Sequence, residues 1–91
     1  MSMSRDDVRK ALIDCILAVA PEADFSNVRP DRPLRDQLDI DSFDFLTILQ
    51  HLHERIGVDV PESDYGKMIT LDGSVDYLMH RPTRPPGAAT P

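Results

Sequence analysis

Apolar residues recur at helical spacing in two long segments of this 91-residue chain, and this periodicity constrains the fold more than any other feature. The first segment covers residues 5 to 20: Ser4 followed by two acids is a helix-start signal, and Pro21 closes the pattern. The second runs from about residue 42 to residue 56 and stops at Gly57, which suits a helix C-cap. The two apolar stripes consist of Val8, Ala11, Leu12, Cys15, Ile16 and Val19, and of Phe45, Ile48, Leu49, Leu52 and Ile56. Because such stripes must be buried, we predict an all-α fold.

Two further helical segments follow. A short one is expected at residues 62 to 67, after Pro61, and another begins at Thr70. The latter carries Leu71, Val75, Leu78 and Met79 on one side. Between the first two helices lies a long loop, residues 21 to 41, which we expect to be pinned to the core by Phe25, Val28, Leu34 and Leu38. The prediction is a small four-helix bundle, with three longer helices, one short helix and a long loop of the kind that tends to be functional.

Length and composition allow one small domain with an aliphatic core. The chain is 41% hydrophobic but only 5% aromatic, and it has no tryptophan. We expect the domain to span residues 1–81, and residues 82–91 to be a disordered tail, because they are rich in proline and poor in apolar surface. The single cysteine, Cys15, excludes an internal disulfide and is predicted to be a buried structural thiol. Since no apolar run suits a membrane span or a secretory signal, the chain is expected to be cytoplasmic.

The negative charge of the chain is concentrated in its middle. The formal net charge is −6, and residues 31–64 alone hold nine acids against three arginines. A surface of this kind repels nucleic acid and anionic membranes, and it attracts basic patches on proteins. We therefore expect protein partners, with no nucleic-acid binding and no membrane insertion.

A lone serine, Ser42, lies among acids at the start of the second long helix. A hydroxyl there suits modification by another enzyme, because the backbone N–H groups and the dipole of a helix start favour a phosphate. The carboxylates of Asp41 and Asp44 are able to hold a divalent cation or to meet a basic partner. The alternative is that Ser42 or Asp41 is an ordinary N-cap, and this segment alone does not decide between the two interpretations.

Two motifs at compatible spacing resemble those of the acyl carrier proteins, the phosphopantetheine-bearing carrier family. The family's attachment motif, Leu-Gly-x-Asp-Ser-Leu-Asp/Glu, is similar to Leu38-Asp39-Ile40-Asp41-Ser42-Phe43-Asp44. Its C-terminal signature is similar to Val60-Pro61-Glu62-Ser63-Asp64, Lys67-Met68-Ile69-Thr70-Leu71 and Val75-Asp76-Tyr77-Leu78. The resemblance covers about residues 4 to 80.

This resemblance implies a non-catalytic carrier. Ser42 would receive a 4′-phosphopantetheine arm from coenzyme A through a phosphopantetheinyl transferase, and Asp41 would help that transferase to place its magnesium ion. The arm supplies a mobile thiol that carries an acyl group as a thioester, which a hydroxyl cannot do. The competing interpretation is a small acidic helical interaction module without a prosthetic group, in which Ser42 is only a cap.

Departures from the family pattern favour a specialised pathway. Asp39 stands where the family usually has glycine, Phe43 replaces the common leucine, and Thr47 and His53 stand where carriers of fatty acid synthesis tend to have glutamate. We expect a dedicated, monomeric carrier of an acyl or aminoacyl group, loaded by its own ligase and served downstream by an acyltransferase or synthase. Its predicted partner-binding face consists of Phe43, Asp44, Leu46, Thr47, Gln50 and Glu54.

Other chemistries fit the sequence less well. His51 and His53 are two residues apart on a helix and point to different faces, so we expect them to be solvated and predict no metal site. The acids around Ser42 lack the spacing of an EF-hand loop, and a Ser/His/Asp triad would have no nucleophile elbow to hold it. We expect no catalysis by the isolated domain.

Overall fold

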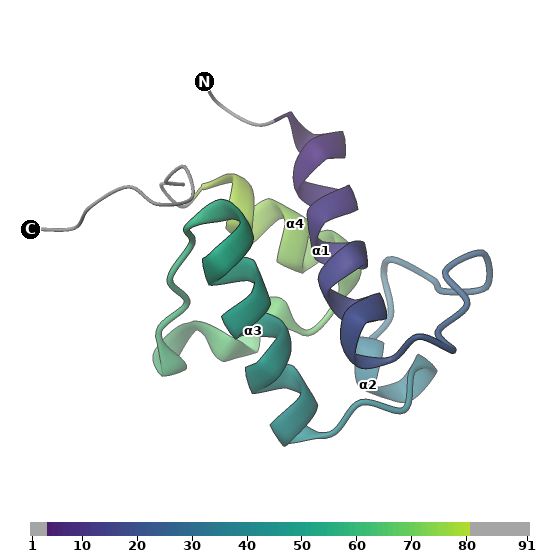
Figure 1. Cartoon of the computed structure of the whole chain (residues 1–91). Helices are drawn as coiled ribbons and strands as arrows, with labels where there is room; N and C mark the ends of the chain where they lie inside the picture. Colours follow the sequence, from purple (N-terminus) through teal and green to yellow (C-terminus); the bar gives the residue numbers. More distant parts are fainter. Residues whose placement is uncertain (1–3, 81–91) are drawn as a thin grey trace, which may run out of the picture.

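The computed structural model describes residues 4–80, which form five helices (Figure 1). They are α1 (Arg5–Val19), α2 (Leu34–Gln37), α3 (Ser42–Ile56), the 3₁₀ helix η1 (Glu62–Met68) and α4 (Leu71–Met79). Helix α1 packs against α3 and α4, and η1 packs against α4. The predicted all-α bundle is confirmed, whereas the predicted tail, residues 82–91, lies outside the described part of the chain. No helix within residues 4–80 is long and apolar enough to cross a membrane.

The two long helices begin and end where the sequence predicts. In α1 the hydroxyl of Ser4 accepts a hydrogen bond from the backbone N–H of Asp7, 3.1 Å away, and the carboxylate of Asp7 accepts one from the N–H of Ser4. Such a capping box satisfies two backbone donors that the helix itself leaves unpaired. Helix α3 ends at Gly57, which has a φ of 69° and thus adopts the left-handed conformation that glycine tolerates best.

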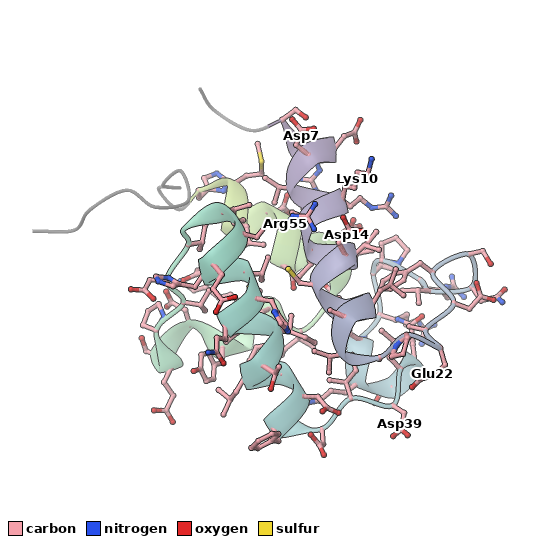
Figure 2. All side chains as sticks on the ribbon, in the orientation of Figure 1. Asp7, Lys10, Asp14, Glu22, Asp39 and Arg55 are labelled. Carbon is pink, nitrogen blue, oxygen red and sulfur yellow. The ribbon has the colours of Figure 1, made fainter. Side chains whose placement is uncertain are left out.

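The core lies where α1, α3 and α4 meet. Its most deeply buried large side chains include Leu12, Ile16, Leu52, Leu71 and Leu78. At the edge of this core the guanidinium of Arg55 on α3 forms an ion pair with the carboxylate of Asp14 on α1, with Nη2 and Oδ2 2.9 Å apart (Figure 2).

Cys15 is buried in this core, as predicted. Burial raises the pKa of the Cys15 thiol above its ordinary value, because the thiolate would lose its hydration there. The nearby Arg55 opposes this change and the carboxylate of Asp14 adds to it. Cys15 is therefore a neutral packing residue.

The predicted apolar side of α4 needs one correction. Leu71, Val75 and Leu78 are buried, but Met79 is 40% exposed, and Ser74 is buried in its place. The reason is helical geometry: positions 71, 74, 75 and 78 follow the i, i+3, i+4, i+7 rule, whereas position 79 turns toward the edge of that face.

The long loop is pinned to the core by the four predicted side chains. Leu34 and Leu38 are buried, and Phe25 and Val28 pack against the core while partly exposed. Two backbone hydrogen bonds add to these contacts: the N–H of Leu34 donates to the carbonyl of Ile69, and the N–H of Asp72 donates to the carbonyl of Pro30. The end of the loop is thereby tied to the junction of η1 and α4.

The loop also contains the four-residue helix α2, which the sequence did not predict. Its last residue, Gln37, holds the preceding turn: Nε2 donates to the carbonyls of Arg29 (2.9 Å) and Arg32 (3.1 Å), and Oε1 accepts from the N–H of Arg29 (2.6 Å). Asp39, the departure from the family glycine, needs no left-handed backbone, since Gly57 alone has a positive φ within residues 4–80. The turn into α3 therefore tolerates a side chain at this position.

Candidate functional site

Asp41 and Ser42 occupy different positions at the start of α3. Asp41 is the N-cap, and its Oδ1 accepts a hydrogen bond of 2.8 Å from the backbone N–H of Asp44. The carboxylate of Asp44 in turn accepts from the N–H of Asp41. Ser42 is the first helical residue and is exposed, so its hydroxyl has no part in the cap. The N-cap interpretation thus holds for Asp41 and is wrong for Ser42.

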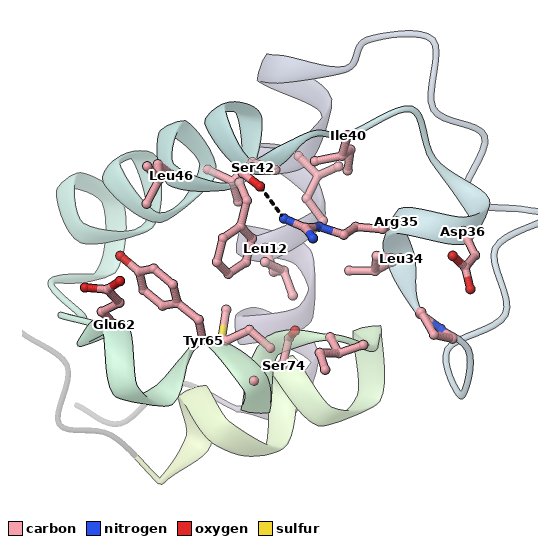
Figure 3. Close-up of a pocket in the computed structure, with 17 residues that line it drawn as sticks. Leu12, Leu34, Arg35, Asp36, Ile40, Ser42, Leu46, Glu62, Tyr65 and Ser74 are labelled. Atoms are coloured by element: carbon pink, nitrogen blue, oxygen red, sulfur yellow. Dashed lines mark hydrogen bonds between the residues drawn. The ribbon is translucent and has the colours of Figure 1, made fainter.

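The hydroxyl of Ser42 contacts an arginine that sequence analysis missed. Nη2 of Arg35, on α2, donates to Oγ of Ser42 across 2.8 Å (Figure 3). Arg35 is one of only three arginines in the acidic segment of residues 31–64, and this rarity is the one sequence feature that could have indicated its role. The contact depends on how α2 is oriented relative to α3, and the spacing of apolar residues in the sequence does not indicate that orientation.

A cavity of about 640 Å³ opens beside Ser42. Its walls come from all five helices of the described part of the chain: Leu12 lies on α1, Arg35 on α2, Ser42 and Leu46 on α3, Tyr65 on η1 and Ser74 on α4 (Figure 3). The ring of Phe45, which also lines it, packs edge to face on that of Tyr65 with centroids 5.2 Å apart. The volume is in the range of small-molecule sites. Sequence analysis did not predict this cavity, because its walls are far apart in the chain.

One wall of the cavity carries a buried hydroxyl. Ser74 is 1% exposed and lines the cavity, and no side-chain hydrogen bond to its Oγ forms among residues 4–80. A buried hydroxyl is stabilised by a polar partner. The cavity therefore offers one polar group deep within largely apolar walls.

The predicted partner-binding residues lie along one exposed side of α3. Phe43 is 77% exposed and Leu46 is 48% exposed; Gln50 and Glu54 are exposed as well. Asp44 and Thr47 are half-buried, and Oγ1 of Thr47 donates to the carbonyl of Phe43. Across the cavity, Ile69 is 53% exposed and extends the apolar surface beyond α3, which the sequence did not indicate.

The metal-ligating residue types are scattered. Within residues 4–80 no three histidine, cysteine or acidic side chains gather in a geometry that could hold an ion. Nδ1 of His53 lies 3.4 Å from Oδ1 of Asp59, and His51 is half-buried on another part of α3. Asp41 is a single carboxylate beside Ser42, with Oδ1 engaged in the cap.

Comparison with known proteins agrees with this geometry. The family model described as "Phosphopantetheine attachment site" matches residues 10–78. The chain belongs to this phosphopantetheine-attachment family. The acyl carrier protein of Rubrobacter xylanophilus is 28% identical over 81 residues, which cover 89% of this chain and 99% of the relative. The acyl carrier protein of Tropheryma whipplei is 29% identical over 79 residues, covering 87% of this chain and 95% of the relative.

Membership makes the chain a non-catalytic, acyl carrier-type protein that works with partner enzymes and has a covalently attached 4′-phosphopantetheine as prosthetic group. The residues around Ser42 fit that group. An exposed hydroxyl is available for the ester, a guanidinium is within hydrogen-bond reach of it, and an apolar cavity opens beside it. Such a donor set suits a phosphate joined to a long organic chain.

Proposed function

We propose that Ser42 bears the 4′-phosphopantetheine arm, and that the protein shuttles a thioester-bound acyl or aminoacyl group between enzymes of a specialised pathway. The observation that carries the assignment is the placement of the Ser42 hydroxyl, which is exposed at the first turn of α3, outside the cap and beside the cavity. The arm, when bound, supplies the thiol for the thioester.

The other serines in the described part of the chain suit this role less well. Ser4 caps α1, the hydroxyl of Ser26 donates a hydrogen bond to the carboxylate of Asp24, and Ser74 is buried. Ser63 is exposed but lies in η1, away from any attachment motif. Ser42 therefore combines exposure with the Asp-Ser motif, and Ser63 is a suitable control.

Asp41 is proposed to contact the magnesium ion of the phosphopantetheinyl transferase. Magnesium is usually bound by one or two carboxylates together with the phosphates of a substrate. Because the cap uses Oδ1 of Asp41, its Oδ2 remains for such a contact next to the Ser42 hydroxyl. A single carboxylate suits an ion that arrives with coenzyme A and the transferase.

The exposed side of α3 is proposed to receive the partner enzymes. Phe43, Leu46, Thr47 and Gln50 offer a mixed surface, with Asp44 and Glu54 supplying the negative charge. This balance supports a dedicated acyl- or aminoacyl-loading ligase and a downstream acyltransferase or synthase, as opposed to the partners of fatty acid synthesis. We place the protein in the cytoplasm as a monomer that does not bind nucleic acid.

The cavity supports a cargo that folds back onto the carrier. Its apolar walls suit aliphatic groups, and the buried hydroxyl of Ser74 suits a cargo with at least one polar atom, such as a carbonyl or an amine. This polar group favours an aminoacyl or functionalised acyl cargo over a plain alkyl chain.

Intact-mass spectrometry tests the proposal. The protein is incubated with coenzyme A, magnesium and a broad-specificity phosphopantetheinyl transferase. We expect the wild type and the Ser63→Ala variant to gain the mass of one arm, and Ser42→Ala to gain none. An arm on Ser42→Ala would show that the site assignment is wrong, and a wild type that gains no arm would favour an interaction module without a prosthetic group.

A further inference from the structure

We propose that Arg35 is a positioning residue that binds the phosphodiester of the arm and holds it beside the cavity. The proposal rests on the proposed attachment of the arm to Ser42. Its starting point is the hydrogen bond of 2.8 Å from Nη2 of Arg35 to Oγ of Ser42, the atom that would become the ester oxygen.

The chemistry of Arg35 matches the group that would replace the hydroxyl hydrogen. A phosphodiester brings a negative charge and two non-bridging oxygens that accept hydrogen bonds better than the ester oxygen does. The guanidinium is planar, stays charged, and presents several N–H donors in a fork that suits two phosphate oxygens. Since Arg35 already reaches Oγ, it can bind the neighbouring phosphate oxygens with only a small change of its side chain.

The negative charges around Ser42 would disfavour a phosphate there unless a positive side chain offsets them. Asp39, Asp41 and Asp44 lie within three residues of the serine, so a phosphate added there meets like charge. Arg35 makes no ion pair with any carboxylate of residues 4–80, whereas Arg55, in the same acidic segment, is paired with Asp14. The guanidinium of Arg35 is thus available to the phosphate.

The position of Arg35 also bears on the direction of the arm. Arg35 and Ser42 come from α2 and α3 and both line the cavity (Figure 3). A phosphate bound to both residues is held on the cavity side of Ser42, and the adjoining chain then starts next to the cavity. The structural basis is the short helix α2. It is held in place by the hydrogen bonds of Gln37 and by two backbone hydrogen bonds, from Leu34 to Ile69 and from Asp72 to Pro30.

Phosphorus NMR of the loaded protein tests this role without any enzyme assay. The wild type, Arg35→Gln, Arg35→Lys and the matched control Arg32→Gln are loaded from coenzyme A by the transferase. Arg32 is also exposed, and its side chain makes no hydrogen bond or ion pair within residues 4–80, so its variant removes the same charge. The ³¹P shift of each is compared with that of a phosphopantetheinylated peptide of residues 38–46. Amide spectra check that each variant is folded.

We expect the wild-type ³¹P resonance to be displaced from that of the peptide. At least half of this displacement should be lost in Arg35→Gln, part of it should be restored in Arg35→Lys, and all of it should persist in Arg32→Gln. The side-chain Nε–H resonance of Arg35 should also shift when the wild type is loaded.

Three results would overturn the role of Arg35. One is an unchanged ³¹P shift in Arg35→Gln, and another is an equal change in Arg32→Gln, which would indicate a general charge effect. The third is failure of Arg35→Gln to accept the arm, which would assign Arg35 to the transfer reaction. In all three the wild type is loaded, so the proposed function stands. If the wild type itself gains no arm, the proposed function fails and this inference fails with it.

Discussion

Asp41 and Ser42 are adjacent residues: Asp41 stabilises the start of α3, and Ser42 is the proposed site of modification. Asp41 caps α3, and loss of such a cap typically costs about 1 kcal/mol of stability. Ser42 makes no cap contact, so its replacement by alanine should cost much less. The Ser42→Ala variant is therefore a clean test of function, because it leaves the start of α3 intact.

Cys15 leads to a prediction about thiol reactivity. Because burial raises its pKa and keeps it from solvent, the apo protein should show almost no reactive thiol near neutral pH. After loading, one thiol should react rapidly with Ellman's reagent, and this should be the thiol of the arm. In guanidinium chloride a second should appear. Rapid reaction of the native apo protein would show that Cys15 is accessible and that its assigned burial is wrong.

Single residues were predictable from sequence only where the contact is local. The Asp-Ser motif indicated the exposed hydroxyl, and helical spacing indicated that Phe43 and Leu46 leave the apolar stripe. The contact of Arg35 with Ser42 joins two elements and was missed. Burial of Ser74 in place of Met79 was missed because hydrophobicity alone favours the methionine.

Among the helices, α3 bears the predicted docking surface, and Phe43 gives its sharpest test. Leu46 also lines the cavity, whereas Phe43 is exposed and does not. Burying a large apolar side chain contributes roughly 1.5–3 kcal/mol. Phe43→Ala should therefore lower kcat/KM for arm transfer by a broad-specificity transferase about tenfold or more.

Two control variants accompany this measurement. Met79 is an exposed apolar residue at the C-terminal end of α4, about 12 Å along that helix from Leu71 at its start. It is not part of the predicted docking surface on α3, so Met79→Ala should leave the rate unchanged. Glu54→Gln removes one exposed charge, worth less than about 1 kcal/mol, and should mainly weaken the salt dependence. Equal rates for Phe43→Ala and the wild type would exclude Phe43 from the docking surface used by that transferase.

Helix α2 depends on Gln37, which makes several hydrogen bonds to the turn before it. A typical hydrogen bond contributes about 0.5–1.5 kcal/mol net, and the three that Gln37 makes to Arg29 and Arg32 are exposed, so each should contribute toward the lower end. Gln37→Ala should lower the free energy of unfolding by about 1–2 kcal/mol, measured by urea denaturation, and should speed amide exchange in residues 29–34.

Gln50→Ala is the matched control for this change. Gln50 is exposed on α3, and its side chain makes no hydrogen bond within residues 4–80, so the variant should stay within about 0.5 kcal/mol of the wild type. If both glutamine variants had the same stability, the hydrogen bonds of Gln37 would not be what holds α2.

The long helices could be predicted because each repeats its apolar period over several turns and carries its own caps. Helix α2 has four residues, fewer than one apolar repeat needs, and begins directly after Pro33. It is held by side-chain and backbone bonds to other segments, which a local pattern does not contain. The cavity was unpredictable for the same reason, since its lining residues come from five helices that are separate in the sequence.

For the molecule as a whole, the fold places the exposed hydroxyl of Ser42 beside a cavity. The core of α1, α3 and α4 holds the start of α3 in place, and the pinned loop brings α2 and its arginine to Ser42. On the proposed function, partner enzymes meet a small acidic carrier on which Phe43, Leu46 and Ile69 are exposed apolar residues. The proposed function requires that the arm be attached to Ser42.

Peptide mapping of the loaded wild-type protein by tandem mass spectrometry decides this point without any substitution. We predict that the arm is found on the peptide containing Ser42, and that fragment ions on either side of this residue place the added mass on it alone. Peptides containing Ser26, Ser63 or Ser74 should be unmodified. An arm located on any residue other than Ser42 would contradict the assignment of the site.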